Sequence, residues 1–87
     1  MALQKINPAA ARVRWDRRMN RPARIQLADR DLTITNLAAR RDEMAAFPAE
    51  RGPRVTYLVE TADGGRASLV FDGRRRRWFV EALEAAA

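Results

Sequence analysis

Three runs near the C-terminal end of the chain are rich in residues that favour β-strands, and in the first of them, residues 54–60, hydrophobic and polar residues alternate. Alternation with a period of two is typical of β-strands that bury one face. Asp63-Gly64-Gly65 separates the first two runs and Asp72-Gly73 separates the last two, and both segments favour hairpin turns because glycine tolerates positive φ. The runs cover residues 54–60, 66–71 and 77–80. The pattern therefore predicts a three-stranded β-meander over residues 54–80.

The first half of the chain contains a weaker version of the same alternation. Residues 23–27 and 32–35 place Ile25, Leu27, Leu32 and Ile34 on one face, and the aspartate-rich segment 28–31 between them favours a turn. The two runs therefore predict a hairpin. Residues 12–16 also alternate and predict a further strand, although a short helix over residues 9–19 is an alternative.

The spacing changes between the hairpin and the meander. Leu37, Arg40/Arg41, Met44 and Phe47 recur every three or four residues, which predicts a helix of about three turns. Thr35 or Asn36 can cap its start, and a proline at position 48 ends it. Residues 81–87 predict one or two further helical turns at the C-terminus.

Together these elements predict an α+β domain with the order (β)ββαβββ. A small antiparallel β-sheet or an SH3-like curled barrel of five to six strands satisfies this order, with the helix packed on it. Residues 1–11 are expected to be a flexible lead-in and residues 12–87 a single small domain. The expected core comprises Ile25, Leu27, Leu32, Ile34, Leu37, Met44, Val55, Tyr57, Leu69, Phe71, Trp78 and Val80.

The composition argues against an enzyme. The 87 residues include no histidine and no cysteine, which removes imidazole bases, thiol nucleophiles and the usual zinc ligands. Asp29 and Asp31 are interpreted as turn residues, and Ser68 has no histidine to activate it. We therefore expect no catalytic residues, no metal and no cofactor.

Two arginine clusters carry the functional prediction. The chain has 17 basic and 11 acidic residues, a net charge of +6, and arginine binds phosphate oxygens with two parallel hydrogen bonds. Phe79 follows the second cluster and could stack on a base. The predicted nucleic-acid-binding residues are Arg12, Arg14, Arg17, Arg18, Arg21, Arg74, Arg75, Arg76, Arg77 and Phe79. Arg24 extends the first cluster. Trp78 is expected to point inward because it shares a face with Val80.

Alternatives to nucleic-acid binding remain open. A sheet edge and an arginine-rich face also suit an acidic protein partner or a second copy of the chain. Arginine and alanine both have GC-rich codons, so part of the arginine excess reflects base composition. No apolar stretch is long enough to span a membrane as a helix, and a cytoplasmic location is expected because cysteine is absent.

Overall fold

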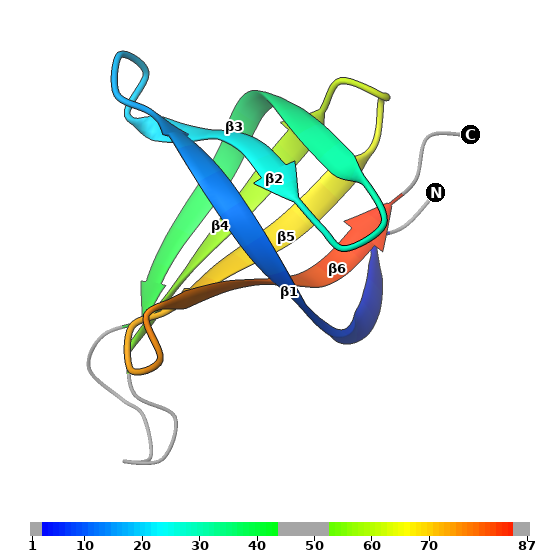
Figure 1. The fold of residues 1–87 in the computed structure, drawn as a ribbon. Helices are drawn as coiled ribbons and strands as arrows, with labels where there is room; N and C mark the ends of the chain where they lie inside the picture. Colours follow the sequence, from blue (N-terminus) through cyan, green and yellow to red (C-terminus); the bar gives the residue numbers. More distant parts are fainter. Residues whose placement is uncertain (1–2, 44–52, 85–87) are drawn as a thin grey trace.

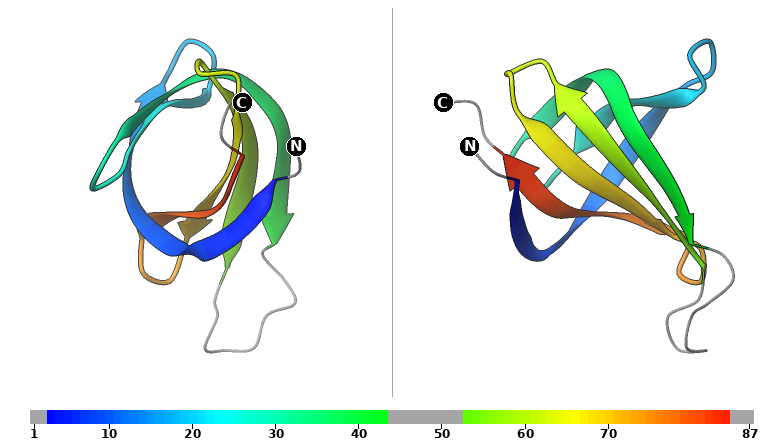
Figure 2. Two further views of the ribbon diagram at one scale, coloured as in Figure 1. Left: turned by 90° about the vertical axis from the view of Figure 1, so that its right-hand side faces the viewer. Right: turned by 180° about the vertical axis from the view of Figure 1, so that it is seen from behind.

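The computed structural model describes residues 3–43 and 53–84, and these residues form an all-β structure (Figure 1). Each strand pairs antiparallel with the next, and β6 pairs with β1, so the sheet closes into a six-stranded barrel. The ring of strands is visible in the left view of Figure 2. The strands are β1 (Gln4–Asp16), β2 (Arg21–Gln26), β3 (Asp31–Glu43), β4 (Arg54–Thr61), β5 (Arg66–Asp72) and β6 (Arg77–Glu84). The barrel is consistent with the small SH3-like barrel expected from the sequence.

The predicted strands of the meander are confirmed as β4, β5 and β6. Their inward residues form the centre of the core, together with Ile25, Leu32 and Ile34 from the N-terminal hairpin. Leu27, Leu37, Val55 and Trp78 pack against this core while partly exposed, which confirms that Trp78 points inward. Met44 lies outside the described residues. The expected core omits several buried residues: Val59 and Ala67, which have no exposed surface, Val70, which is 3% exposed, and Pro22.

The predicted helix after residue 36 is wrong, because residues 37–43 belong to β3. The register of β3 against β4 shifts twice, between Ile34 and Asn36 and again between Leu37 and Ala39. Each shift inserts one extra residue, as a β-bulge does. Ile34, Leu37 and Arg40 therefore pair with inward residues of β4 at intervals of three, which imitates helical spacing. The rest of the predicted helix lies outside the described residues.

The predicted terminal helix and the N-terminal lead-in are also corrected. Residues 81–84 continue β6, where a register shift places Val80 and Leu83, three residues apart, opposite inward residues of β5. Residues 4–11 form the first part of β1 and pair with β6. The strand predicted at residues 12–16 is the second part of β1, so the alternative helix there is wrong. None of the described residues forms a helix that could cross a membrane.

The up-and-down order places alternate connections at opposite ends of the barrel. The turns 17–20 and 73–76 lie on the same side of the molecule in Figure 1 and in the rear view of Figure 2. These two turns contain five arginines and no acidic residue. We call this the arginine end. The turns at the other end, residues 27–30 and 62–65, contain one arginine and two aspartates.

Candidate nucleic-acid interface

The turn between β1 and β2 is organised by an aspartate at the end of β1. The Asp16 carboxylate accepts hydrogen bonds from the backbone N–H groups of Arg18 (2.9 Å) and Met19 (3.2 Å). Asn20 then adopts a left-handed conformation, with φ of 54°, which asparagine tolerates better than most residues. The turn thus holds Arg17 and Arg18 at the arginine end.

The turn between β5 and β6 repeats this design. The Asp72 carboxylate accepts hydrogen bonds from the backbone N–H groups of Arg74 (3.0 Å) and Arg75 (3.1 Å). The fourth residue after the aspartate is again left-handed, here Arg76 with φ of 55°. Both turns therefore follow the pattern Asp-x-Arg-x-x-Arg, directly after an aromatic residue.

Four aromatic rings meet at the arginine end and form what we call the aromatic cluster: Trp15, Tyr57, Phe71 and Trp78. The Trp78 ring lies 6.4 Å from Trp15, 5.7 Å from Tyr57 and 5.0 Å from Phe71, measured between centroids. Trp15 also meets Tyr57 edge-on at 6.0 Å. These spacings are those of favourable aromatic pairs. The cluster connects the strand ends that lead into and out of the two arginine turns.

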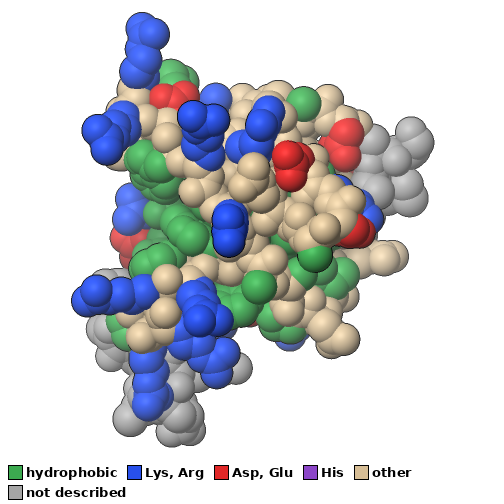
Figure 3. All heavy atoms as spheres, viewed as in Figure 1, with side chains coloured by type: hydrophobic (Ala, Val, Ile, Leu, Met, Phe, Trp, Pro, Cys, Tyr) green, Lys and Arg blue, Asp and Glu red, His purple; other side chains and the backbone are tan. Residues whose placement is uncertain are grey.

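The rings differ in their access to solvent. Tyr57 is buried, and the guanidinium of Arg40 lies 5.6 Å from its ring centroid in a cation–π contact. Arg40 also forms an ion pair with Asp42, with 3.0 Å between Arg40 Nε and Asp42 Oδ1. Trp15 is instead 38% exposed, and Met19 in the adjacent turn is 59% exposed. Figure 3 shows hydrophobic side chains between groups of basic side chains on this side of the molecule.

The first predicted cluster continues along the outer face of the barrel. Val13 of β1 pairs with the buried Ile25 of β2, and the next pair along the two strands is Arg14 with Arg24. Because successive side chains of a strand point to opposite faces, Arg14 and Arg24 point outward, and both are exposed. Like charges directly opposite on a sheet repel, and an anion bound between them would relieve that repulsion. Arg12 lines a surface hollow together with Arg77 of β6. The structure therefore brings one member of each predicted cluster to the same hollow.

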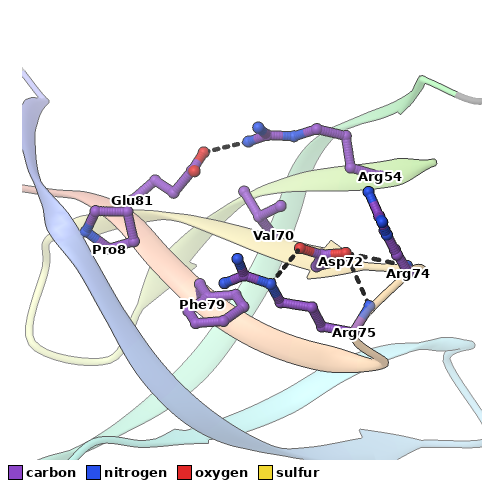
Figure 4. Close-up of a pocket in the computed structure, with 8 residues that line it drawn as sticks. All are labelled: Pro8, Arg54, Val70, Asp72, Arg74, Arg75, Phe79 and Glu81. Atoms are coloured by element: carbon purple, nitrogen blue, oxygen red, sulfur yellow. Dashed lines mark hydrogen bonds and ion pairs between the residues drawn. The ribbon is translucent and has the colours of Figure 1, made fainter. Parts of the chain in front are cut away.

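Phe79 lies on the outer face, on the opposite side of β6 from Trp78. Figure 4 shows it with Val70 and the arginines of the β5–β6 turn around a second hollow of about 480 Å³. The guanidinium of Arg75 reaches back to Asp72, at 4.0 Å. Glu81 and Arg54 form an ion pair at the edge of the same hollow. Phe79 thus stands beside arginines, although acidic groups also line its hollow.

Ion pairing divides the arginines into two groups. The ion pairs found in the described parts of the chain include Arg66–Glu84, which links the neighbouring strands β5 and β6, and Arg54–Glu81, which links β4 to β6 across β5. Among acidic side chains that the structure describes, none forms an ion pair with the first predicted cluster. That cluster comprises Arg12, Arg14, Arg17, Arg18 and Arg21, and Arg24 extends it. These guanidinium groups can therefore take an external anion without first breaking such a pair.

The residues weighed for catalysis occupy structural positions. Asp29 is an exposed turn residue that meets Arg30 at 3.5 Å, and Ser68 has Leu58 and Ala82 as its neighbours across the sheet. Asp63 is held by a hydrogen bond from the Thr61 hydroxyl, which, together with the Gly65 N–H, lowers the pKa of its carboxyl below the ordinary 3.8. Within residues 3–43 and 53–84, no three acidic side chains gather to hold a metal ion.

The sequence-based list of site residues missed the aromatic cluster (Trp15, Tyr57, Phe71 and Trp78) and Arg40. The face that Trp78 shares with Val80 indicated a core position for this tryptophan, and the spacing around Arg40 indicated a helix. A signal was present in the repeated spacing, because Trp15 and Phe71 each precede an Asp-x-Arg-x-x-Arg turn. Comparison with known proteins adds no assignment: no protein-family model, curated protein or solved structure matches the chain.

Proposed function

We propose that this barrel is a non-catalytic binding module that contacts nucleic acid through arginine–phosphate contacts. The observation that carries the proposal is the position of the two arginine clusters (Figure 1, Figure 2). Their turns lie at one end of the barrel, and Arg12 and Arg77 line one hollow. The binding surface comprises the arginine end and the adjoining outer face of β1 and β2. A cytoplasmic location and the absence of a cofactor remain predictions.

The charge distribution favours a polyanion over a small anion. Five arginines lie in the two turns, and three more (Arg12, Arg14 and Arg24) lie on the adjoining strands β1 and β2. A phosphate backbone offers charges at regular intervals, so several arginines can each contact a different phosphate. Such contacts position a nucleic acid without reading its sequence. The proposed binding is therefore led by the backbone and tolerant of sequence.

The proposal is tested by the salt dependence of binding to DNA and RNA. Each phosphate contact releases counterions, so the logarithm of affinity should fall with the logarithm of salt concentration by about 0.7–0.9 per contact. Replacing Arg74, Arg75 and Arg77 by glutamine should make this slope shallower and weaken binding to every sequence alike. Arg30→Gln, at the other end of the barrel, is a control for loss of one charge. Absence of any binding by the wild-type protein at low salt would refute the proposal.

A second candidate function is docking of a protein strand on β3. Residues 31–33 of β3 pair with β2, whereas the residues from Ile34 onward pair with β4 alone among the described strands. An unpaired strand edge can accept a strand from a partner or from a second copy of the chain. Light scattering at low and high salt distinguishes this function, because a strand-paired dimer would persist in salt that abolishes phosphate binding.

A further inference from the structure

The aromatic cluster has a role that phosphate contacts do not require. We infer that Trp15 is a stacking platform for an unpaired base, and that the module therefore prefers single-stranded nucleic acid to a duplex. This inference rests on the proposed function and adds the class of nucleic acid to it. It depends on the exposure of Trp15, on the rings that support it and on the charges around it.

Trp15 is the ring of the cluster that is available to a ligand. It is 38% exposed, whereas Tyr57 is 6% exposed and carries Arg40 over its ring. Trp78 and Phe71 pack against one another, with centroids 5.0 Å apart. A nucleobase is a flat partner that can cover the exposed ring of Trp15.

The platform is held in place before any ligand arrives. Trp15 pairs in register with the buried Pro22, and its ring meets Tyr57 edge-on and Trp78 at an interplanar angle of 36°. The following residue, Asp16, fixes the turn through two hydrogen bonds to backbone N–H groups. Because the ring has few conformations left to lose, stacking on it costs little ordering entropy.

The charges beside the platform suit the phosphates that flank a stacked base. Arg14 precedes Trp15, Arg17 follows it by two residues, and Arg77 directly precedes Trp78. These arginines are neighbours of the two tryptophans in the sequence, so a strand whose base covers Trp15 has basic residues near its backbone. In a duplex each base is already stacked on its neighbours and is not free to cover Trp15. A duplex can contact the arginines but not the platform, which gives the expected preference.

The experiment compares binding of an unstructured single strand, as DNA and as RNA, with binding of a duplex of the same length. Trp15→Ala is expected to lower affinity for the single strand by about 5- to 150-fold, the loss of one base–aromatic stack, and to leave duplex affinity unchanged. Trp15→Phe should restore most of the loss because it keeps a ring. Met19→Ala is the matched control, since it removes another exposed apolar side chain of this end. Wild-type tryptophan fluorescence should be quenched by the single strand and not by the duplex.

The outcomes separate the inference from the proposed function. If single strand and duplex bind equally, with a steep salt dependence and no effect of Trp15→Ala, the proposed function stands and the platform is overturned. If an acidic peptide binds as tightly as the single strand and with the same dependence on Trp15, the platform belongs to a protein partner and the inference is overturned. If Trp15→Ala fails to fold by circular dichroism, Trp15→Phe and the wild-type quenching decide the case. Absence of all nucleic-acid binding removes both proposals.

Discussion

Truncation of Leu69 is the sharpest test of the barrel. Leu69 lies in β5, between Tyr57 of β4 and Val80 of β6, and none of its surface is exposed. All three side chains point into the closed barrel, so no flexible element can move in to fill a gap. Leu69→Ala therefore removes buried apolar contacts and leaves a cavity in the middle of the core.

The expected loss is a large share of the total stability. Leucine-to-alanine substitutions at buried sites cost about 2–5 kcal/mol, and the upper values apply where the surroundings cannot collapse. A closed ring of hydrogen-bonded strands collapses poorly, so we expect a loss of about 3–5 kcal/mol for Leu69→Ala. At about 0.05–0.15 kcal/mol per residue, the whole domain has only about 4–13 kcal/mol.

Chemical denaturation followed by tryptophan fluorescence measures this loss. Leu58→Ala is the matched control, because Leu58 belongs to the neighbouring strand but faces outward opposite Ser68, where it is half-buried. Its truncation should cost about 1 kcal/mol, as expected for a side chain that keeps part of its surface in water. A loss below about 1 kcal/mol for Leu69→Ala, or one equal to that of Leu58→Ala, would refute the assignment of Leu69 to a closed core.

Three further substitutions test the turns. Gly65→Ala would place a Cβ 2.1 Å from the backbone oxygen of Glu84, so we expect the free energy of unfolding to fall by about 1–3 kcal/mol. An unchanged midpoint of chemical denaturation would contradict this close approach. Arg76→Gly should raise the free energy of unfolding by about 0.5–1 kcal/mol, because glycine adopts the left-handed conformation without strain. The same substitution should make the salt dependence of nucleic-acid binding shallower, because it removes a positive charge. A lower free energy of unfolding would show that the backbone at residue 76 is not strained. Asp63 has a pKa lowered chiefly by the hydrogen bond from Thr61, so its charge stabilises the folded state above the ordinary pKa and this contribution is lost as the pH falls through the lowered value. Thermal unfolding should therefore show the largest deficit of Asp63→Asn at neutral pH and a shrinking one in acid, and a deficit independent of pH would contradict the assignment.

Features of this fold that depend on residues close together in the chain could be predicted from the sequence. Alternation and the glycine-containing turns were sufficient to predict the meander of β4, β5 and β6, because a hairpin is specified by its own turn and by the faces of two adjacent strands. The arginine clusters could also be identified from the sequence, because their members are close together in the chain. Trp78 could be assigned to the inside because it shares a face with Val80, a relation of two residues on one strand.

The tertiary structure alone decided how β3 runs and which strands meet. Bulges in β3 and β6 place inward residues three apart, as at Leu37 and Arg40, and only pairing with another strand reveals that such spacing belongs to a sheet. Likewise, the ring contact between Trp15 and Trp78 joins residues far apart in sequence. It exists because β1 closes on β6, and this closure is selected by burial of the whole barrel interior rather than by any local preference of the two strands.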